Sequence, residues 1–265
     1  MMLVKIFLNF TDNNRGSQFW FVFAKNFVSF RLKKLICTCY RKGGKGVKLT
    51  IDSKDLLTEE DKKFPYKKAK KELLNGDGDF RSIECDKYFE ECDIIITNPP
   101  FSLFQSLFNI GISKNKKMLL IGNQNSIAYK EVFKYIKEDK MFLGYTTPDD
   151  FILPNGTISK KLHGMCRWFT NLSVNVYKKE FVPQERYSES KYQKYDGYNC
   201  LHIEKTCQIP ADYGGLMAVP ITFLDKYNPK QFEIVGKANK GSGTNYDLFK
   251  PILRGEYKYK RPVIR

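Results

Sequence analysis

The amino-acid sequence predicts an α/β fold in which a mostly parallel sheet carries helices on both faces. Apolar, strand-like runs alternate with helical patterns through the first 145 residues, as in repeated strand–helix–strand units. One of these runs, DIIIT at residues 93–97, has the continuous β-branched character of a strand buried on both faces. The chain has 265 residues, of which 42% are hydrophobic and 15% aromatic, so it can form a sizeable core.

The elements of this sheet domain follow from hydrophobic periodicity. Strands are predicted at residues 3–10, 33–40, 47–51, 93–97 and 116–123. Helices are predicted at residues 17–31, 82–91, 102–112 and 128–138. Within the first of these helices, five aromatic residues recur at helical spacing: Phe19, Trp20, Phe23, Phe27 and Phe30.

The pattern changes after about residue 145. Prolines, glycines, tyrosines and short β-like runs dominate, at residues 167–177, 214–224 and 232–236. We therefore expect residues 1–145 to form the core domain. Residues 146–265 are expected to complete its sheet and to add a second region.

The charge of the chain indicates a polyanionic partner. Lysine and arginine number 45 against 29 aspartates and glutamates, a formal net charge of +16. The cations are spread along the chain, with local runs such as RLKKL, KKAKK and KYKYKRP. Neutralising many phosphates requires such distributed cations, although a solvated surface is the better explanation for any single lysine.

Cysteine and histidine usage favours a reducing cytoplasm and no metal. The seven cysteines are odd in number and form no regular disulfide framework. Only two histidines are present, and the spacing Cys200-x-His202-x-x-x-x-Cys207 is interpreted as chance. The apolar first ten residues are too short to span a bilayer, so we expect no membrane association.

The segment DIIITNPPF, residues 93–101, is the most informative stretch. In an open parallel sheet the ligand crevice lies beyond the carboxyl ends of the strands, which is where Asn98 follows this strand. Pro99 and Pro100 lock φ and lack N–H donors, so they make a stiff loop with bare carbonyls. Such a loop can direct the Asn98 amide oxygen and a backbone carbonyl at one amino group, while Phe101 offers a flat face for a planar ring.

This segment resembles the catalytic motif of S-adenosylmethionine-dependent methyltransferases that modify the exocyclic amine of adenine. The longer runs GDFRSxEC, LLIGNQNSIAYKEVF, RWFTNL and VPITFLDKYNPKQFEIVG are similar to the adenine-specific DNA methyltransferases of the EcoRI modification-enzyme type. The resemblance extends from about residue 17 to 249. It implies a Rossmann-like methyltransferase fold with a C-terminal target-recognition region within residues 146–265.

The resemblance also implies a mechanism. The enzyme would be a site-specific DNA adenine-N6 methyltransferase of a restriction–modification system, acting as a monomer on double-stranded DNA. The target adenine would leave the duplex, because its amine is unreachable while stacked and paired. Asn98 and the Pro99 carbonyl would accept hydrogen bonds from that amine, Pro100 would stiffen the loop and Phe101 would stack on the ring, so that catalysis comes mostly from orientation and electrostatics.

Three residues are candidates for binding the cofactor, S-adenosylmethionine. Asp12 and Gly16 lie in TDNNRGSQFW, which resembles the D-x-x-x-G-S pattern of amino-methyltransferases; a capping turn explains this segment nearly as well. Asp79 in GDF precedes the NPPF motif by one strand–helix unit. It resembles the residue that binds the cofactor adenine, although a plain turn aspartate is the alternative.

In the second region, Trp168 and Phe169 either line the base pocket or fill the core. The stretch ERYSESKYQKYDGY, residues 185–198, is predicted to be a DNA-facing loop, since Arg, Lys and Tyr can reach phosphates and unstacked bases.

Two other functions remain open. The chain could be a DNA-binding protein with a degenerate, inactive methyltransferase core. This alternative rests on two observations. The strand that ends at Cys39-Tyr40-Arg41 has no acidic residue to hold the ribose of the cofactor, and the segment before the first strand is short. The chain could also methylate RNA or protein glutamine, because NPP followed by an aromatic residue occurs in those enzymes too.

Overall fold

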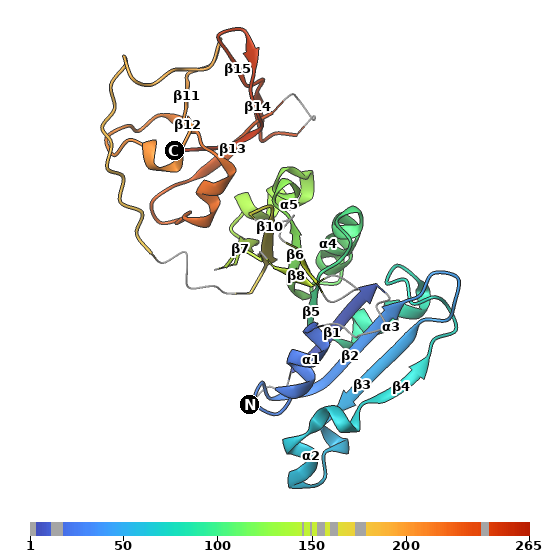
Figure 1. Ribbon diagram of the computed structural model, residues 1–265. Coiled ribbons are helices and arrows are strands. Elements are labelled where there is room, and N and C mark those ends of the chain that lie inside the picture. The colour runs from blue at the N-terminus through green and yellow to red at the C-terminus, as the bar shows by residue number, and fades with distance from the viewer. Residues whose placement is uncertain are drawn as a thin grey trace. The chain divides into compact units, whose positions relative to one another are not determined.

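The computed structural model describes residues 4–11, 18–144, 146–148, 150–152, 157–159, 164–172, 179–239 and 244–265. The chain divides into two compact units, each described by itself below (Figure 1). The first consists of Met1–Ser126 and Thr146–Leu172, and the second of Ile127–Tyr145 and Ser173–Arg265. Among the described residues, no helix has both the length and the apolar character that crossing a membrane requires.

The first unit is a sheet with helices packed against it. The strands of its main sheet are β1 (Val4–Thr11), β2 (Leu32–Tyr40), β3 (Val47–Asp52), β4 (Lys70–Leu73), β5 (Ile94–Thr97), β6 (Lys117–Asn123) and β10 (Cys166–Thr170). They are ordered β4-β3-β2-β1-β5-β6-β10. The helices are α1 (Gln18–Lys25), α2 (Glu59–Lys63), α3 (Ile83–Glu91) and α4 (Phe104–Ser113). A separate small ribbon pairs β8 (Phe151–Ile152) with β9 (Ile158–Ser159).

The sheet is mixed rather than mostly parallel. The central strands are parallel, with β1 between β2 and β5, and β5 beside β6. In contrast, β3 is antiparallel to β2, β4 to β3, and β10 to β6. The connection from β2 to β3 is too short for the crossover that parallel strands need, so these two strands form a hairpin. An α/β fold is confirmed.

Helices cover both faces of the sheet, as predicted. On one face, Trp20 of α1 belongs to a buried cluster with Leu35 of β2 and Ile96 of β5. Side chains alternate along a strand, so the neighbouring Ile36 and Ile95 point to the other face. Both are buried as well, and α3 contacts β1. This two-sided burial accounts for the continuous apolar runs of β2 and β5.

Helix α1 is shorter than the aromatic spacing predicts, because it ends at Lys25 rather than near residue 31. The side-chain amide of Asn26 donates to the Val22 carbonyl at 2.8 Å, the same oxygen that its backbone N–H contacts at 3.1 Å. Asparagine competes in this way with the regular helical pattern. The chain then reaches Arg31 in the left-handed region, with φ 54°, and enters β2.

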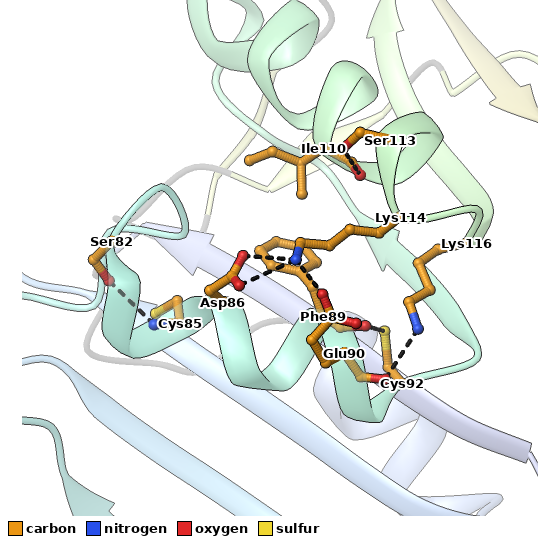
Figure 2. A network of polar contacts seen from close by, with 10 residues as sticks. All are labelled: Ser82, Cys85, Asp86, Phe89, Glu90, Cys92, Ile110, Ser113, Lys114 and Lys116. Atoms are coloured by element: carbon orange, nitrogen blue, oxygen red, sulfur yellow. Dashed lines mark hydrogen bonds and ion pairs between the residues drawn. The ribbon is translucent and has the colours of Figure 1, made fainter.

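Helix α4 is fixed to α3 by charged contacts at its carboxyl end (Figure 2). The Lys114 ammonium contacts Asp86 at 2.9 Å and also pairs with Glu90. The Lys116 ammonium donates to the Glu90 carbonyl at 3.0 Å. These contacts lie at the end of α4 away from the NPPF turn, so they hold the helix without occupying that turn.

The second unit has its own sheet and core. Its sheet is ordered β11-β12-β17-β13-β14. The strands are β11 (Cys200–His202), β12 (Leu216–Ala218), β13 (Ile234–Ala238), β14 (Asp247–Phe249) and β17 (Arg261–Ile264), and helix α5 (Lys130–Lys137) contacts β13. Strand β7 (Phe142–Leu143) also belongs to this unit, and β15 (Ile252–Leu253) pairs with β16 (Glu256–Tyr257) as a separate ribbon.

His202 is a half-buried, neutral residue of this core. Its Nδ1 lies 2.7 Å from the Tyr195 hydroxyl. Burial, assisted by the nearby Arg261, lowers the pKa of His202 to about 4. Burial also raises the pKa of Tyr195 to about 12, so that hydroxyl keeps its proton at neutral pH.

The free energy of unfolding should therefore fall as the pH drops from about 6.5 to 4. Over that range the unfolded chain protonates this histidine and the native state does not, so acid favours unfolding. We expect a loss of about 1–2 kcal/mol, allowing for partial exposure. Urea titrations of the wild type and His202→Gln at several pH values measure it. Parallel stability curves for the two proteins would contradict this expectation.

Candidate active site

The NPPF turn begins at the centre of the first unit's sheet. Strand β5 lies between β1 and β6 and is parallel to both. Its residues Ile95, Ile96 and Thr97 are buried, and Asn98 is the first half-buried position after them. The turn therefore leaves the sheet at its carboxyl edge, where the sequence predicts the ligand crevice.

Local hydrogen bonding makes this turn stiff and leaves two acceptors available. The Pro100 carbonyl accepts the Leu103 N–H at 2.8 Å, which closes a short 3-10 turn over Phe101–Leu103. In the described part of the chain, no hydrogen bond involves the Asn98 side-chain amide or the Pro99 carbonyl. Because the two prolines fix the backbone, the Pro99 carbonyl is held in place, and the Asn98 side chain extends from a backbone that Pro99 restricts.

The two phenylalanines of the turn have different surroundings. Phe104 is fully buried, with its ring centroid 4.9 Å from that of Phe169. Gly122 of β6 makes room for it, because a Cβ there would lie 2.5 Å from the Phe104 ring. Phe101, in contrast, is only half-buried. Phe104 thus anchors the start of α4, while part of the Phe101 ring remains accessible.

Of the two aromatic residues predicted on β10, only one belongs wholly to the core. Phe169 is fully buried against Phe104. Trp168 is half-buried and meets Phe19 of α1 edge-on, with 6.0 Å between ring centroids. Phe169 therefore packs against Phe104, next to the NPPF turn, rather than lining a pocket.

Asp79 lies at the same carboxyl edge as Asn98. Its loop crosses the end of β2, because the Arg41 N–H donates to the Asp77 carbonyl at 2.8 Å. Gly78, with φ +81°, lets the loop approach, since a Cβ there would lie 2.7 Å from the Cys39 carbonyl oxygen. Strands β2 and β5 both flank β1, so the Asp79 loop lies at the end of one neighbour of β1 and Asn98 follows the other.

The Asp79 carboxylate is bound by Arg81. The guanidinium contacts it through Nη2 at 2.6 Å and Nε at 3.0 Å, and the Arg81 backbone N–H donates at 2.8 Å. These hydrogen bonds lower the pKa of Asp79, so the group is ionised at neutral pH. A ligand amine at Asp79 must replace one of these contacts, and the Arg81 side chain is half-exposed and can move.

Asp12 and Gly16 lie outside the described residues. Strand β1 ends at Thr11, which is paired in register with Tyr40 of β2, so the segment containing them starts at this same edge. The end of β6 lies where the sequence predicts it, but the polar residues there are not among the predicted site candidates. Asn123 Oδ1 there accepts the Asn125 N–H at 2.8 Å, and the buried Ser126 hydroxyl has no partner among the described residues. The polar run GNQNS after an apolar strand was the available signal.

No metal site accompanies this edge in the part of the chain that the structure describes, where no three His, Cys, Asp or Glu side chains are grouped to hold an ion. None of the seven cysteines, all of which lie in the described part of the chain, forms a disulfide. Cys207 is exposed, whereas Cys200 is buried in the core of the second unit.

The mixed α/β sheet and the polar, proline-rich turn at the end of its central strand are consistent with a methyltransferase. The chain belongs to the family described as adenine-specific methyltransferase EcoRI, whose model matches residues 3–261. The family predicted from the sequence motifs is thereby confirmed, and with it the enzyme class.

Three curated relatives are similar over most of the chain. The type II methyltransferase M.EcoRI of Escherichia coli is 39% identical, over 96% of this chain and 83% of the relative. M.MgeORF184P of Mycoplasma genitalium is 35% identical, and M.MpnI of Mycoplasma pneumoniae 32%. Both of these alignments cover 87% of this chain and 74% of the relative. No solved structure matches the chain significantly.

Proposed function

We propose that this methyltransferase modifies the N6 amine of adenine at a specific site in double-stranded DNA, as in restriction–modification. The observation that carries the proposal is the NPPF turn, where two acceptors without a hydrogen-bond partner among the described residues stand beside a half-buried phenylalanine at the carboxyl edge. An amine with two N–H groups on a flat ring matches that set of groups. The names of the relatives and the +16 charge support DNA as the substrate.

The turn would bind the adenine in a reactive orientation. The Asn98 amide oxygen and the Pro99 carbonyl accept the two N–H groups of the amine, while the Pro100 carbonyl stays engaged with Leu103. The Pro99 carbonyl belongs to a rigid backbone and Asn98 directly precedes it, so of the two acceptors only the Asn98 side chain has to be ordered when the base binds. The nitrogen lone pair then points away from the acceptors. Phe101 stacks on the ring of the extruded base.

S-adenosylmethionine fits the same edge. Asp79 is an ionised, half-buried carboxylate and can accept a hydrogen bond from the amino group of the cofactor adenine. Asp12 and Gly16, which follow β1, would hold the methionine end. When bound, the cofactor supplies an electrophilic methyl group.

The division of labour along the chain is part of the proposal. Residues 1–145 would form the catalytic core, and residues 146–265 would complete its sheet and read the target. The pairing of β10 with β6 supports the completion of the core sheet by residues beyond 145. The separate sheet and core of the second unit support a separate region that reads the target. A monomer in the cytoplasm belongs to the same proposal.

A methyl-transfer assay tests the function directly. The protein is incubated with methyl-labelled cofactor and unmethylated plasmid DNA, and the nucleosides are separated after digestion. We expect label in N6-methyladenine alone, confined to one sequence when the plasmid is mapped. Label in cytosine, or transfer only to RNA or to protein glutamine, would refute the proposal.

Binding to duplex DNA should depend steeply on salt. If many of the distributed cations contact phosphates, bound counterions are released and affinity falls with ionic strength. For about 6–10 phosphate contacts, the loss between about 50 and 200 mM salt is about 10³–10⁵-fold. Fluorescence anisotropy with a labelled duplex measures it. An affinity that does not respond to salt would favour the RNA or glutamine substrates.

A further inference from the structure

The second unit carries a small β-ribbon that stands apart from its main sheet. Among the described residues, strands β15 and β16 pair with each other alone, Ile252 with Tyr257 and Leu253 with Glu256. Leu253 is buried in the core of the unit and anchors the ribbon. The tip, in contrast, is exposed: a Cβ added at Gly255 would meet no atom within 4 Å.

The turn at the tip is held rigidly from outside the ribbon. The Asp196 carboxylate accepts the Arg254 N–H at 3.0 Å and the Gly255 N–H at 2.7 Å. The Asp196 N–H in turn donates to the Ile252 carbonyl at 2.9 Å. One aspartate therefore fixes the backbone of the turn through three hydrogen bonds, and the ribbon is preorganised rather than flexible.

Arg254 is an unusual residue for its position. It lies in the left-handed region with φ 53°, followed by Gly255 with φ +79°. Two-residue hairpin turns of this kind strongly favour asparagine or aspartate before the glycine. Arginine adopts this conformation less readily, so the residue at the tip departs from the usual preference for such turns. In the described part of the chain the exposed Arg254 side chain has no ion pair or hydrogen bond.

Cations and exposed aromatic rings lie close to this tip in sequence. Residues 250–260 contain Lys250, Lys258 and Lys260 and one carboxylate, that of Glu256, which pairs with Lys258 at 2.6 Å, while the Asp196 carboxylate is engaged by the backbone of the turn. Tyr257 and Tyr259 are 52% and 86% exposed, and Tyr259 is the most exposed aromatic residue in the described part of the chain. Leu253 and Lys258 also border a cleft of about 280 Å³ that Lys191, Gln193 and His202 help to line.

We propose that the β15–β16 ribbon reads double-stranded DNA, with Arg254 at the base edges in the major groove and the neighbouring lysines on the phosphates. The proposal rests on the function proposed above and names the element of the second unit that recognises the target. The major groove of B-form DNA admits a two-stranded ribbon, and arginine is the commonest partner of guanine there. The deep, narrow major groove of duplex RNA does not admit one.

The test compares Arg254→Asn with Arg31→Asn. Both arginines are exposed and left-handed, with φ 53° and 54°, so both substitutions remove one charge and relieve the same backbone conformation. The Asp196 contacts to Arg254 involve only backbone, so Arg254→Asn should keep its melting temperature. Arg31 precedes β2 at the amino edge of its sheet, away from the NPPF edge, which makes Arg31→Asn the matched control.

Two labelled duplexes provide the readout by fluorescence anisotropy at fixed salt. One carries the sequence that methylation mapping identifies, and the other is a scrambled duplex of equal composition. Arg254→Asn should weaken binding to the site about ten- to hundredfold. It should change binding to the scrambled duplex only about threefold. Arg31→Asn should stay within about twofold of wild type on both duplexes.

A third variant, Arg254→Lys, separates base reading from simple attraction. It keeps the charge but replaces the planar fork of arginine by a single ammonium group, so it should bind the scrambled duplex as the wild type does and lose part of the discrimination. Wild-type discrimination in either Arg254 variant would overturn the ribbon proposal while leaving a DNA methyltransferase intact. Wild-type protein that neither binds nor methylates DNA would overturn the proposed function and the ribbon proposal together.

Discussion

Replacing Asn98 by alanine is expected to reduce methyl transfer by about a hundredfold or more. In the described chain the Asn98 amide has no hydrogen-bond partner, and it stands on a turn whose backbone is fixed by Pro99 and Pro100. Its contribution would therefore arise only when the amine of the substrate is present. Initial rates with labelled cofactor and plasmid DNA give the change in kcat/KM.

The same reasoning predicts no change in folding or in DNA affinity. The Asn98 side chain makes no hydrogen bond among the described residues, so the melting temperature of Asn98→Ala should stay close to that of the wild type. Asn109→Ala is a matched control, because Asn109 is exposed on α4 in the same unit. It should retain full activity. Near wild-type turnover by Asn98→Ala would remove Asn98 from the mechanism.

Local periodicity was sufficient to predict most elements of the first unit. Residues 82–91 were predicted as a helix, and α3 spans Ile83–Glu91 because Ser82 caps it by accepting the Cys85 N–H. The strand at residues 93–97 was also found, as β5. Such elements are determined by caps and runs that lie within a few residues.

The direction in which strands pair could not be predicted in this way. The run at residues 47–51 has the pattern of a strand, and β3 is one, but nothing in the pattern says that it runs antiparallel to β2. That outcome depends on the length and path of the connection. The mixed sheet was therefore beyond a prediction based on alternating elements alone.

Tyrosine was the residue most difficult to interpret. Tyr192 and Tyr195 were predicted to face DNA, but they are only 7% and 3% exposed, and Tyr198 stacks on Phe249 at 4.1 Å. A ring with one polar atom suits a core as well as a nucleic-acid surface. The highly exposed Tyr257 and Tyr259 lie instead in a stretch that the sequence distinguished only by its charge.

The position of the site was predictable because the NPPF motif carries its own geometry. Asn98, Pro99, Pro100 and Phe101 are consecutive, so their proximity required no knowledge of the fold. The relation of Asp79 to this turn did require it. A loop that crosses the end of β2 brings Asp79 to the same edge, and that path depends on Gly78 and on the Arg41–Asp77 contact.

The pair Phe101 and Phe104 provides the sharpest separation of binding from stability. Phe104→Ala should lower the free energy of unfolding by about 3–5 kcal/mol, because its ring is fully buried between Phe169 and Gly122. Phe101→Ala should leave the melting temperature close to that of the wild type, since that ring is only half-buried. It should instead weaken the productive DNA complex by about 1–3 kcal/mol.

Fluorescence of 2-aminopurine, placed at the target adenine, tests the stacking role of Phe101 in the same samples. Extrusion from the duplex raises the emission, and a stacked ring then quenches part of that gain, so complexes of Phe101→Ala should be brighter than wild type. Phe101→Tyr and Phe101→Trp keep a flat ring and should retain substantial activity. If Phe101→Ala melts far below the wild type, and its folded complex has unchanged fluorescence, then Phe101 belongs to the core. The adenine would in that case need another stacking partner, and the half-buried Trp168 is the other aromatic residue of this unit to test first.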